Sequence, residues 1–193
     1  IINNGGQMGA YNGWERANWF AKNGDDTSEK SSQTWNREGP WFARVKEECL
    51  SVNGNVGVLD LPGFSRFKVE GLGASEFLLG KISGNLPSIG RMNLAYFPDE
   101  RGRVLTEMSV MRHEINKFTL ITAGAAQWHD CEILKSGIKK NQNVKVSDIT
   151  NSWTCLIVTG PNSRALMSRI SNADLTLPWL SLQNAVIQNK QIL

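Results

Sequence analysis

The residue with the clearest potential for chemistry is Glu107, in the stretch GRMNLAYFPDERGRVLTEMSVMR at residues 90–112. Residues 92–97 and 104–111 are typical of two β-strands. The sequence PDERG at residues 98–102 is typical of the turn between them, because proline fixes φ and glycine tolerates positive φ. Alternate side chains of a strand point to opposite faces. One face of the second strand carries Leu105, Glu107, Ser109 and Met111, and the other carries Val104, Thr106, Met108 and Val110.

The carboxylate of Glu107 therefore stands alone among mostly apolar neighbours. A carboxylate that a strand holds inside an apolar pocket can serve as the single proton acceptor for a neutral ligand. The alternative is that Glu107 faces solvent on a half-exposed strand, since glutamate is common on protein surfaces. The pattern of residues alone leaves both interpretations open.

The composition describes an ordinary globular protein. The chain has 193 residues, of which 40% are hydrophobic and 20% charged, enough for one domain or slightly more. The net charge is +3 and the lysines and arginines are scattered, so we expect no nucleic-acid partner, which would need basic residues clustered on one face. No apolar run of about 18 residues occurs, so we expect no membrane span.

The cysteines and histidines show no metal-binding pattern. Cys49, Cys131 and Cys155 are far apart and odd in number, and His113 and His129 fall on different elements. We therefore predict no metal site and interpret both histidines as structural or surface residues. Without a secretory signal, we expect three reduced, buried thiols in the cytoplasm or, in a eukaryote, the mitochondrial matrix.

Short strands and helices alternate along the chain. We expect strands at residues 56–61, 64–70, 92–97, 104–111, 117–122, 144–149 and 153–159. We expect one helix that begins at Gly39-Pro40 and three more over residues 74–82, 123–140 and 160–170. Several neighbouring strands look like hairpins. This order favours an α+β fold with mainly antiparallel sheets and short helices. In the third helix, Trp128 and Cys131 are available for burial.

Two parts of the chain differ in character. Residues 1–38 show little regular periodicity but contain Trp14, Trp19, Phe20 and Trp35, so we predict an irregular arm whose aromatic rings dock on a globular body. Residues 39–193 form the predicted domain. The chain begins with Ile1 and ends within a strand-like run, so we expect a piece of a longer polypeptide whose domain is truncated at its C-terminal end.

Five segments in this order resemble the aminomethyltransferase (glycine-cleavage T-protein) family, and above all the C-terminal part of dimethylglycine and sarcosine dehydrogenases. They are GWERANWF at residues 13–20, VGVLDLPGFSRFKVEGLGASEFL at 56–78, the stretch at 90–112, the pair His129-Asp130, and VTGPNSRALM at 158–167. Each motif is moderately specific, and the five together cover nearly the whole chain.

The resemblance implies a tetrahydrofolate-binding fold in which the pterin enters a central hole. It implies that folate accepts a one-carbon unit from an N-methylated amine such as dimethylglycine or sarcosine, or from the iminium derived from it. FAD would bind only a separate part of the full-length protein, because no GxGxxG follows a strand here. The fragment alone would then be inactive, and its partner would be the remainder of its own chain.

The same resemblance implies the site residues. The family places an aspartate in a pattern like G-G-I-x-x-D-L-x-V, which matches residues 102–110 here, with Glu107 at the aspartate and Arg103 at the second glycine. A carboxylate beside the folate nitrogens can assist proton transfer and stabilise an iminium, so Glu107 is the predicted catalytic residue. The residues that fall where family members line the pterin site are Leu94, Ala95, Val104, Ser109 and Ile121.

Three functions stay open at this point. The first is the folate-dependent one-carbon transferase part of a dimethylglycine or sarcosine dehydrogenase-like enzyme. The second is a methyltransferase or demethylase of the same fold that acts on a betaine or sulfonium donor. The third is a non-catalytic module that kept the fold, which the departures at Glu107 and Arg103 motivate. A pterin-binding motif like G-E-x-G-[WY]-E has no counterpart before Leu193.

Overall fold

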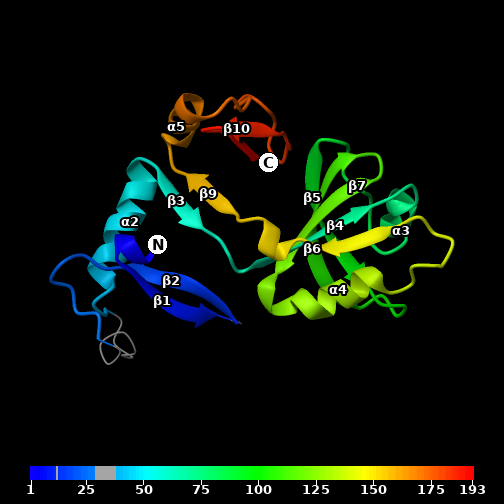
Figure 1. The fold of residues 1–193 in the computed structure, drawn as a ribbon, viewed down its shortest axis with the longest axis horizontal. Coiled ribbons are helices and arrows are strands. Elements are labelled where there is room, and N and C mark those ends of the chain that lie inside the picture. Colours follow the sequence, from blue (N-terminus) through cyan, green and yellow to red (C-terminus); the bar gives the residue numbers. More distant parts are fainter. Residues whose placement is uncertain (12, 29–37) are drawn as a thin grey trace. The chain divides into compact units, whose positions relative to one another are not determined.

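The computed structural model describes residues 1–11, 13–28 and 38–193, and these residues form two compact units (Figure 1). Unit 1 consists of Ile1–Gly63 and Cys155–Arg169, and unit 2 of Phe64–Thr154 and Ile170–Leu193. The domain boundary predicted after residue 38 adjoins residues outside the described ranges, and it stays a prediction.

Unit 1 begins with a β-hairpin. After the short 3₁₀ helix η1 (Ile2–Asn4), strand β1 (Gly6–Tyr11) pairs antiparallel with β2 (Trp14–Phe20). The prediction of an irregular arm is therefore wrong for this part of the chain. The sequence does carry a signal for the hairpin, because Asn-Gly at positions 12 and 13 is a dipeptide typical of two-residue hairpin turns. Trp19 is buried, whereas Trp35 lies outside the described residues.

The rest of unit 1 is a helix, a strand pair and a second helix. Helix α2 (Phe42–Gly54) follows Gly39-Pro40 as predicted. Strand β3 (Gly57–Asp60) pairs antiparallel with β9 (Leu156–Thr159), and helix α5 (Ser163–Ile170) follows β9. No residue of α2 is buried, and Cys49 is exposed, contrary to the expected burial of all three cysteines.

The turn between β9 and α5 requires a glycine. Gly160 has a φ of 115°, and a Cβ placed there would lie 2.4 Å from the carbonyl oxygen of Asn55. The close approach lets the backbone N–H of Asn162 donate to that same oxygen at 3.0 Å. This turn therefore ties the start of α5 to the end of α2 within unit 1.

Unit 2 is built on an antiparallel sheet of five strands with the order β5-β6-β7-β4-β8. The strands are β4 (Phe64–Glu70), β5 (Arg91–Pro98), β6 (Val104–Glu114), β7 (Lys117–Ala123) and β8 (Lys145–Asp148). All five were predicted, with boundaries that differ by a few residues at most. The predicted α+β class with mainly antiparallel sheets is confirmed.

The core of unit 2 lies on one face of this sheet, beneath helices α3 (Ala74–Leu79) and α4 (Gln127–Lys135) (Figure 1). The sheet contributes alternate apolar residues, and the helices contribute the rest. The cluster contains Phe67, Val69, Ala74, Phe77, Leu78, Ile82, Ala95, Phe97, Met108, Val110, Phe118, Leu120, Cys131 and Leu134. Burial of each large side chain among them stabilises the fold by about 1.5–3 kcal/mol.

The turn between β5 and β6 is held by Asp99. Its Oδ1 accepts hydrogen bonds from the backbone N–H groups of Arg101 and Arg103, both at 2.9 Å, and the Arg103 guanidinium lies 2.7 Å from Oδ2. These bonds, the backbone one from Arg103 foremost, lower the pKa of the Asp99 carboxyl. The predicted hairpin is confirmed, and its turn is fixed by a side chain as well as by Gly102, whose φ is 77°.

Two features of unit 2 differ from the predictions. The helix expected over residues 123–140 is shorter, because η2 (Gly124–Ala126) precedes α4 and the chain is extended at Ser136. Trp128 of α4 is 79% exposed rather than buried.

Near the end of the chain, β10 (Ala185–Ile187) and β11 (Lys190–Ile192) form a hairpin through Gln188 and Asn189, both with positive φ. A further 3₁₀ helix, η3 (Thr150–Ser152), follows β8.

Candidate functional site

Three of the predicted cofactor-binding residues lie in one row across the sheet of unit 2. Leu94 of β5 is opposite Ser109 of β6, and Ser109 is opposite Ile121 of β7. Directly opposite residues of antiparallel strands share a face, with Cβ atoms about 4.5–5.5 Å apart. We call the side of β5, β6 and β7 that carries these residues, opposite the core cluster, the open face.

The predicted catalytic residue, Glu107, lies on the same open face beside this row. Glu107 pairs with Tyr96 of β5, and both residues are exposed. Among the described residues, no hydrogen bond or ion pair occupies the Glu107 carboxylate. Of the two arrangements that the sequence left open, the structure has the exposed one rather than a carboxylate inside an apolar pocket. The catalytic role of Glu107 stays a prediction.

The other two predicted cofactor-binding residues do not join the row. Ala95 is opposite Met108, belongs to the core cluster and is 3% exposed. Val104 is 60% exposed at the start of β6, opposite Pro98, where the register between β5 and β6 shifts. The family pattern assigned these positions without regard to the face, whereas the alternation separates Leu94 from Ala95. Only backbone atoms of Ala95 could reach a ligand on the open face.

Strand β4 extends the open face with charged residues that were not among the predicted site residues. Arg66 is opposite Ile121 and is almost completely buried, and its Nη1 donates to the carbonyl oxygens of Thr150 (3.4 Å) and Trp153 (3.2 Å). An arginine between strand residues that face the core is the signal that could have identified it. Its guanidinium adds a positive charge at the edge of the row.

Electrostatic interactions on this part of the open face shift two pKa values. A hydrogen bond from Lys68, with Nζ and the carboxylate 2.8 Å apart, lowers the pKa of Glu70. Burial lowers the pKa of His113, and the positive charges of Lys117 and Lys68 lower it further. The His113 ring also lies 2.9 Å from the hydroxyl of Thr119. Both shifts favour an ionised glutamate and a neutral histidine near pH 7.

A buried polar cluster lies on the core side of the same strands. Asp130 of α4 has no exposed surface, and its carboxylate accepts hydrogen bonds from the hydroxyls of Thr106 (3.1 Å) and Thr122. The Nδ1 atom of His129 lies 2.9 Å from the other carboxylate oxygen. We call these four residues the Asp130 cluster. From the sequence, the pair His129-Asp130 was notable only for its place in the family order.

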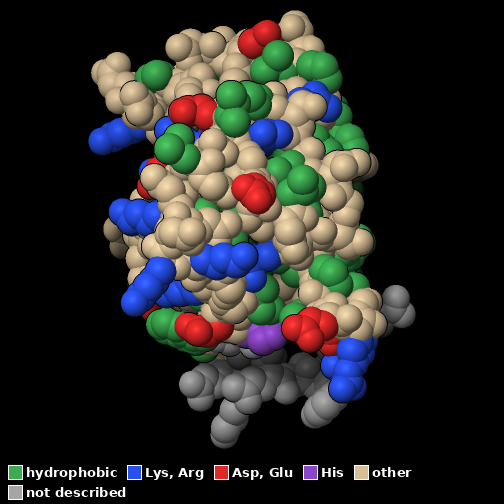
Figure 2. All heavy atoms as spheres, turned by 90° about the vertical axis from the view of Figure 1, so that its right-hand side faces the viewer, with side chains coloured by type: hydrophobic (Ala, Val, Ile, Leu, Met, Phe, Trp, Pro, Cys, Tyr) green, Lys and Arg blue, Asp and Glu red, His purple; other side chains and the backbone are tan. Residues whose placement is uncertain are grey.

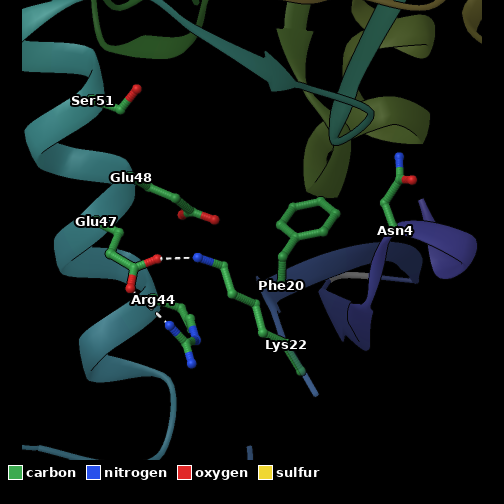
Figure 3. Close-up of a pocket in the computed structure, with 8 residues that line it drawn as sticks. Asn4, Phe20, Lys22, Arg44, Glu47, Glu48 and Ser51 are labelled. Atoms are coloured by element: carbon green, nitrogen blue, oxygen red, sulfur yellow. Dashed lines mark hydrogen bonds and ion pairs between the residues drawn. The ribbon is translucent and has the colours of Figure 1, made fainter.

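Unit 1 contains a separate hollow with a volume of about 310 Å³ (Figure 3). It lies between the end of β2 and one side of α2, and it is lined by Asn4, Phe20, Ala21, Lys22, Arg44, Glu47, Glu48 and Ser51. Its charged groups bind one another, with Lys22 and Arg44 at 2.6 and 2.7 Å from the Glu47 carboxylate. Arg44 also pairs with Asp25 and lowers the pKa of that carboxyl to about 2. These ion pairs hold the hollow's walls together, and no ligand is assigned to it.

Charge is mixed on one side of the molecule. Basic, acidic and apolar side chains lie interspersed on the side drawn in Figure 2. Within the described ranges, no three His, Cys, Asp or Glu residues gather where they could hold a metal ion. No helix in the described part of the chain is long and apolar enough to cross a membrane.

Comparison with solved structures identifies the class of fold. The structure of the glycine cleavage system aminomethyltransferase T from Bartonella henselae matches with a TM-score of 0.73, over 93% of this chain and 44% of that chain, at 20% identity. At this identity the similarity establishes a shared fold. The predicted T-protein fold is thus confirmed.

Sequence comparison then gives the family. The GCVT N-terminal domain matches residues 1–193, and the chain belongs to this family. It is 31% identical over 170 residues to mitochondrial dimethylglycine dehydrogenase of Mus musculus, covering 88% of this chain and 19% of that protein. It is 24% identical over 170 residues to sarcosine oxidase subunit alpha of Rhizobium meliloti, covering 84% and 16%. The predicted resemblance is confirmed, and the chain spans less than a fifth of the length of these relatives.

Proposed function

We propose that this chain forms part of a tetrahydrofolate site in a larger enzyme that transfers a one-carbon unit from an N-methylated amine to folate. Dimethylglycine and sarcosine are the amines that the names of the relatives suggest. The site is the open face, with Leu94, Ser109 and Ile121 against the pterin and Glu107 as the acid–base group. Additional chain of the full-length protein covers this face and completes the cavity.

One observation carries the proposal. A row of small and apolar side chains crosses three strands, and a single carboxylate with no partner among the described residues lies beside it. A flat heterocycle can pack on such a row, while its N–H groups donate to the carboxylate. The membership of the chain in the GCVT family supports a pterin as that heterocycle.

The proposed chemistry is the capture of an electrophilic carbon. N5 of folate attacks the carbon of an iminium, and a C–N bond forms as the π pair of the iminium C=N bond moves to the amine nitrogen. N10 then attacks the same carbon, the bond from that carbon to the amine breaks, and the amine leaves with the proton of N10. Glu107 accepts the proton that N5 loses, and its negative charge stabilises the iminium before the attack. Oxidation of the amine requires a flavin, and in this proposal FAD binds a separate part of the full-length protein. The enzyme works in the cytoplasm or, in a eukaryote, in the mitochondrial matrix.

The experiment uses the full-length protein with tetrahydrofolate and dimethylglycine or sarcosine. We expect saturable binding of tetrahydrofolate and formation of methylenetetrahydrofolate. Glu107→Gln should lower the rate of capture by about 100-fold, the usual contribution of a general acid–base group. Glu100→Gln removes the same charge from the exposed turn of the same hairpin and serves as the control.

Three results would contradict the proposal. The first is that tetrahydrofolate does not bind the full-length protein. The second is a normal rate for Glu107→Gln, which would instead favour a module that kept the fold without the catalytic acid. The third is turnover of a betaine or sulfonium donor without flavin, which would favour a methyltransferase or demethylase of the same fold.

A further inference from the structure

Asp130 has a buried carboxylate, an arrangement that is energetically unfavourable. Its side chain is completely buried, and among the described residues no lysine or arginine pairs with it. Burying a carboxylate costs several kcal/mol unless hydrogen bonds compensate. The hydroxyls of Thr106 and Thr122 and the ring of His129 supply those bonds.

The cluster joins the two strands that carry the proposed site. Thr106 of β6 directly precedes Glu107, and Thr122 of β7 directly follows Ile121. Side chains alternate along a strand. Asp130 therefore binds β6 and β7 on the core side, directly behind the positions where Glu107 and Ile121 project onto the open face. Elsewhere on the core side, the same strands offer apolar residues, namely Met108, Val110, Phe118 and Leu120.

This difference between polar and apolar contacts has a physical consequence. Apolar packing has no preferred direction and tolerates small shifts, whereas a hydrogen bond requires a defined distance and angle. Two hydrogen bonds to one carboxylate therefore fix the backbone of β6 relative to β7. The fixed backbone sets the direction in which the Glu107 side chain projects.

We infer that Asp130 is a positioning residue for Glu107 and acts on it through Thr106 and Thr122. This inference rests on the proposed function. It assigns to a buried side chain, on the face that no ligand reaches, control over the geometry of the open face. A shift of about 1 Å in a catalytic group can cost about 100-fold in rate, so a buried residue can act at this distance.

The simpler role of Asp130 is to anchor α4, whose first turn it occupies. Helix anchoring and positioning predict different effects for matched threonine variants. Thr106→Val keeps the shape of the side chain and removes the donor. Thr106→Ser keeps the donor and removes a methyl group.

The test measures kcat and KM for methylenetetrahydrofolate formation by the full-length protein, at a temperature where every variant is folded. Thr106→Val should lower kcat by about tenfold or more with little change in KM, because the carboxylate is displaced. Thr106→Ser should restore kcat close to the wild-type value. Ser65→Ala is the matched control, because Ser65 is completely buried on the core side of β4 and its hydroxyl has no partner among the described residues.

A normal kcat for Thr106→Val, or a loss that Thr106→Ser does not restore, would overturn the inference. If Thr106→Val does not fold, Asp130→Asn provides the second variant, since it keeps the shape and removes the charge. Asp130→Asn should lower kcat and accelerate hydrogen exchange at the amides of β6 and β7, and unchanged kcat would overturn the inference.

The failure of the proposed function would look different. In that case the wild-type protein forms no methylenetetrahydrofolate. Hydrogen exchange then decides the inference, with faster exchange near Glu107 in Asp130→Asn but not in Ser65→Ala supporting it, and equal exchange overturning it.

Discussion

The two faces of the five-stranded sheet in unit 2 use the same strands for different purposes. On the core side, Phe67, Met108 and Leu120 are completely buried beneath α3 and α4. On the open side, their neighbours Leu94 and Tyr96 are 51% and 45% exposed, and Glu107 and His113 bring ionisable groups. Every second residue of a strand therefore serves stability, and the residues between them are available for binding.

The difference in burial between the two faces explains where polar residues occur in the sheet. An exposed charged residue of the open face, such as Glu107, keeps its contact with water and costs little, whereas a buried one, such as Arg66 or Asp130, needs dedicated partners. On the core side of β6 and β7, the Asp130 cluster meets this requirement with two threonine hydroxyls. Its place directly behind the proposed site is the point at which the two faces are coupled.

The change that would disrupt the division between the two faces most strongly is a shift of β6 by one residue. Insertion of an alanine between Thr106 and Glu107 would move Met108 and Val110 to the open face and turn polar residues toward the core. Each large apolar side chain contributes about 1.5–3 kcal/mol, and a buried unpaired Glu107 costs several more, so the loss approaches the whole stability of a domain.

Urea unfolding followed by tryptophan fluorescence would measure this effect in the full-length protein. The control is an alanine inserted between Glu100 and Arg101, two exposed residues of the turn. A β6 insertion as stable as the turn insertion would show that the alternation does not hold the sheet together.

A pair of substitutions would test the two faces separately. Phe67→Ala should destabilise the protein by about 3–5 kcal/mol, because it leaves a cavity among completely buried side chains. Leu94→Ala should cost less than about 1 kcal/mol, since half of this side chain is already in water, but it should weaken binding of tetrahydrofolate. Urea midpoints and a folate titration measure the two effects. Equal destabilisation would contradict the division of labour between the faces.

The sequence predicted the sheet well because its signals are local. Alternation along residues 104–111 and the turn at residues 98–102 both depend on neighbouring residues, and the structure has the hairpin there. The β1–β2 hairpin was missed although Asn-Gly at positions 12 and 13 indicates such a turn, because the aromatic content favoured a docking arm. Local signals can thus be outweighed by a compositional argument.

The candidate site was harder to predict because its parts are far apart in the chain. The row of Leu94, Ser109 and Ile121 came from the family resemblance, and the same resemblance included Ala95, which faces the core. The Asp130 cluster joins residues 106, 122 and 130, whose meeting depends on how α4 packs on the sheet. No periodicity of the sequence encodes that contact.

The smallest expected effect is a dependence of the free energy of unfolding on pH that arises from the open face. His113 on the open face has a lowered pKa, caused first by burial and then by Lys117 and Lys68. The unfolded chain binds a proton near the ordinary value of 6.5, and the folded chain binds it only at lower pH. The contribution to stability is therefore complete above pH 6.5 and declines as the pH falls below that value toward the lowered folded pKa.

The measurement compares the unfolding midpoints of the wild-type protein and His113→Gln at about pH 7.5 and 5.5. These two pH values bracket the ordinary histidine pKa. The wild-type midpoint should fall more than that of the variant. The lowered pKa of Glu70 stabilises the fold above the ordinary value of 4.5, and this stabilisation is lost only as the pH falls below 4.5, outside the window measured. An equal fall in both proteins would show that the open face adds no pH dependence through His113, and that the sensitivity arises elsewhere in the chain.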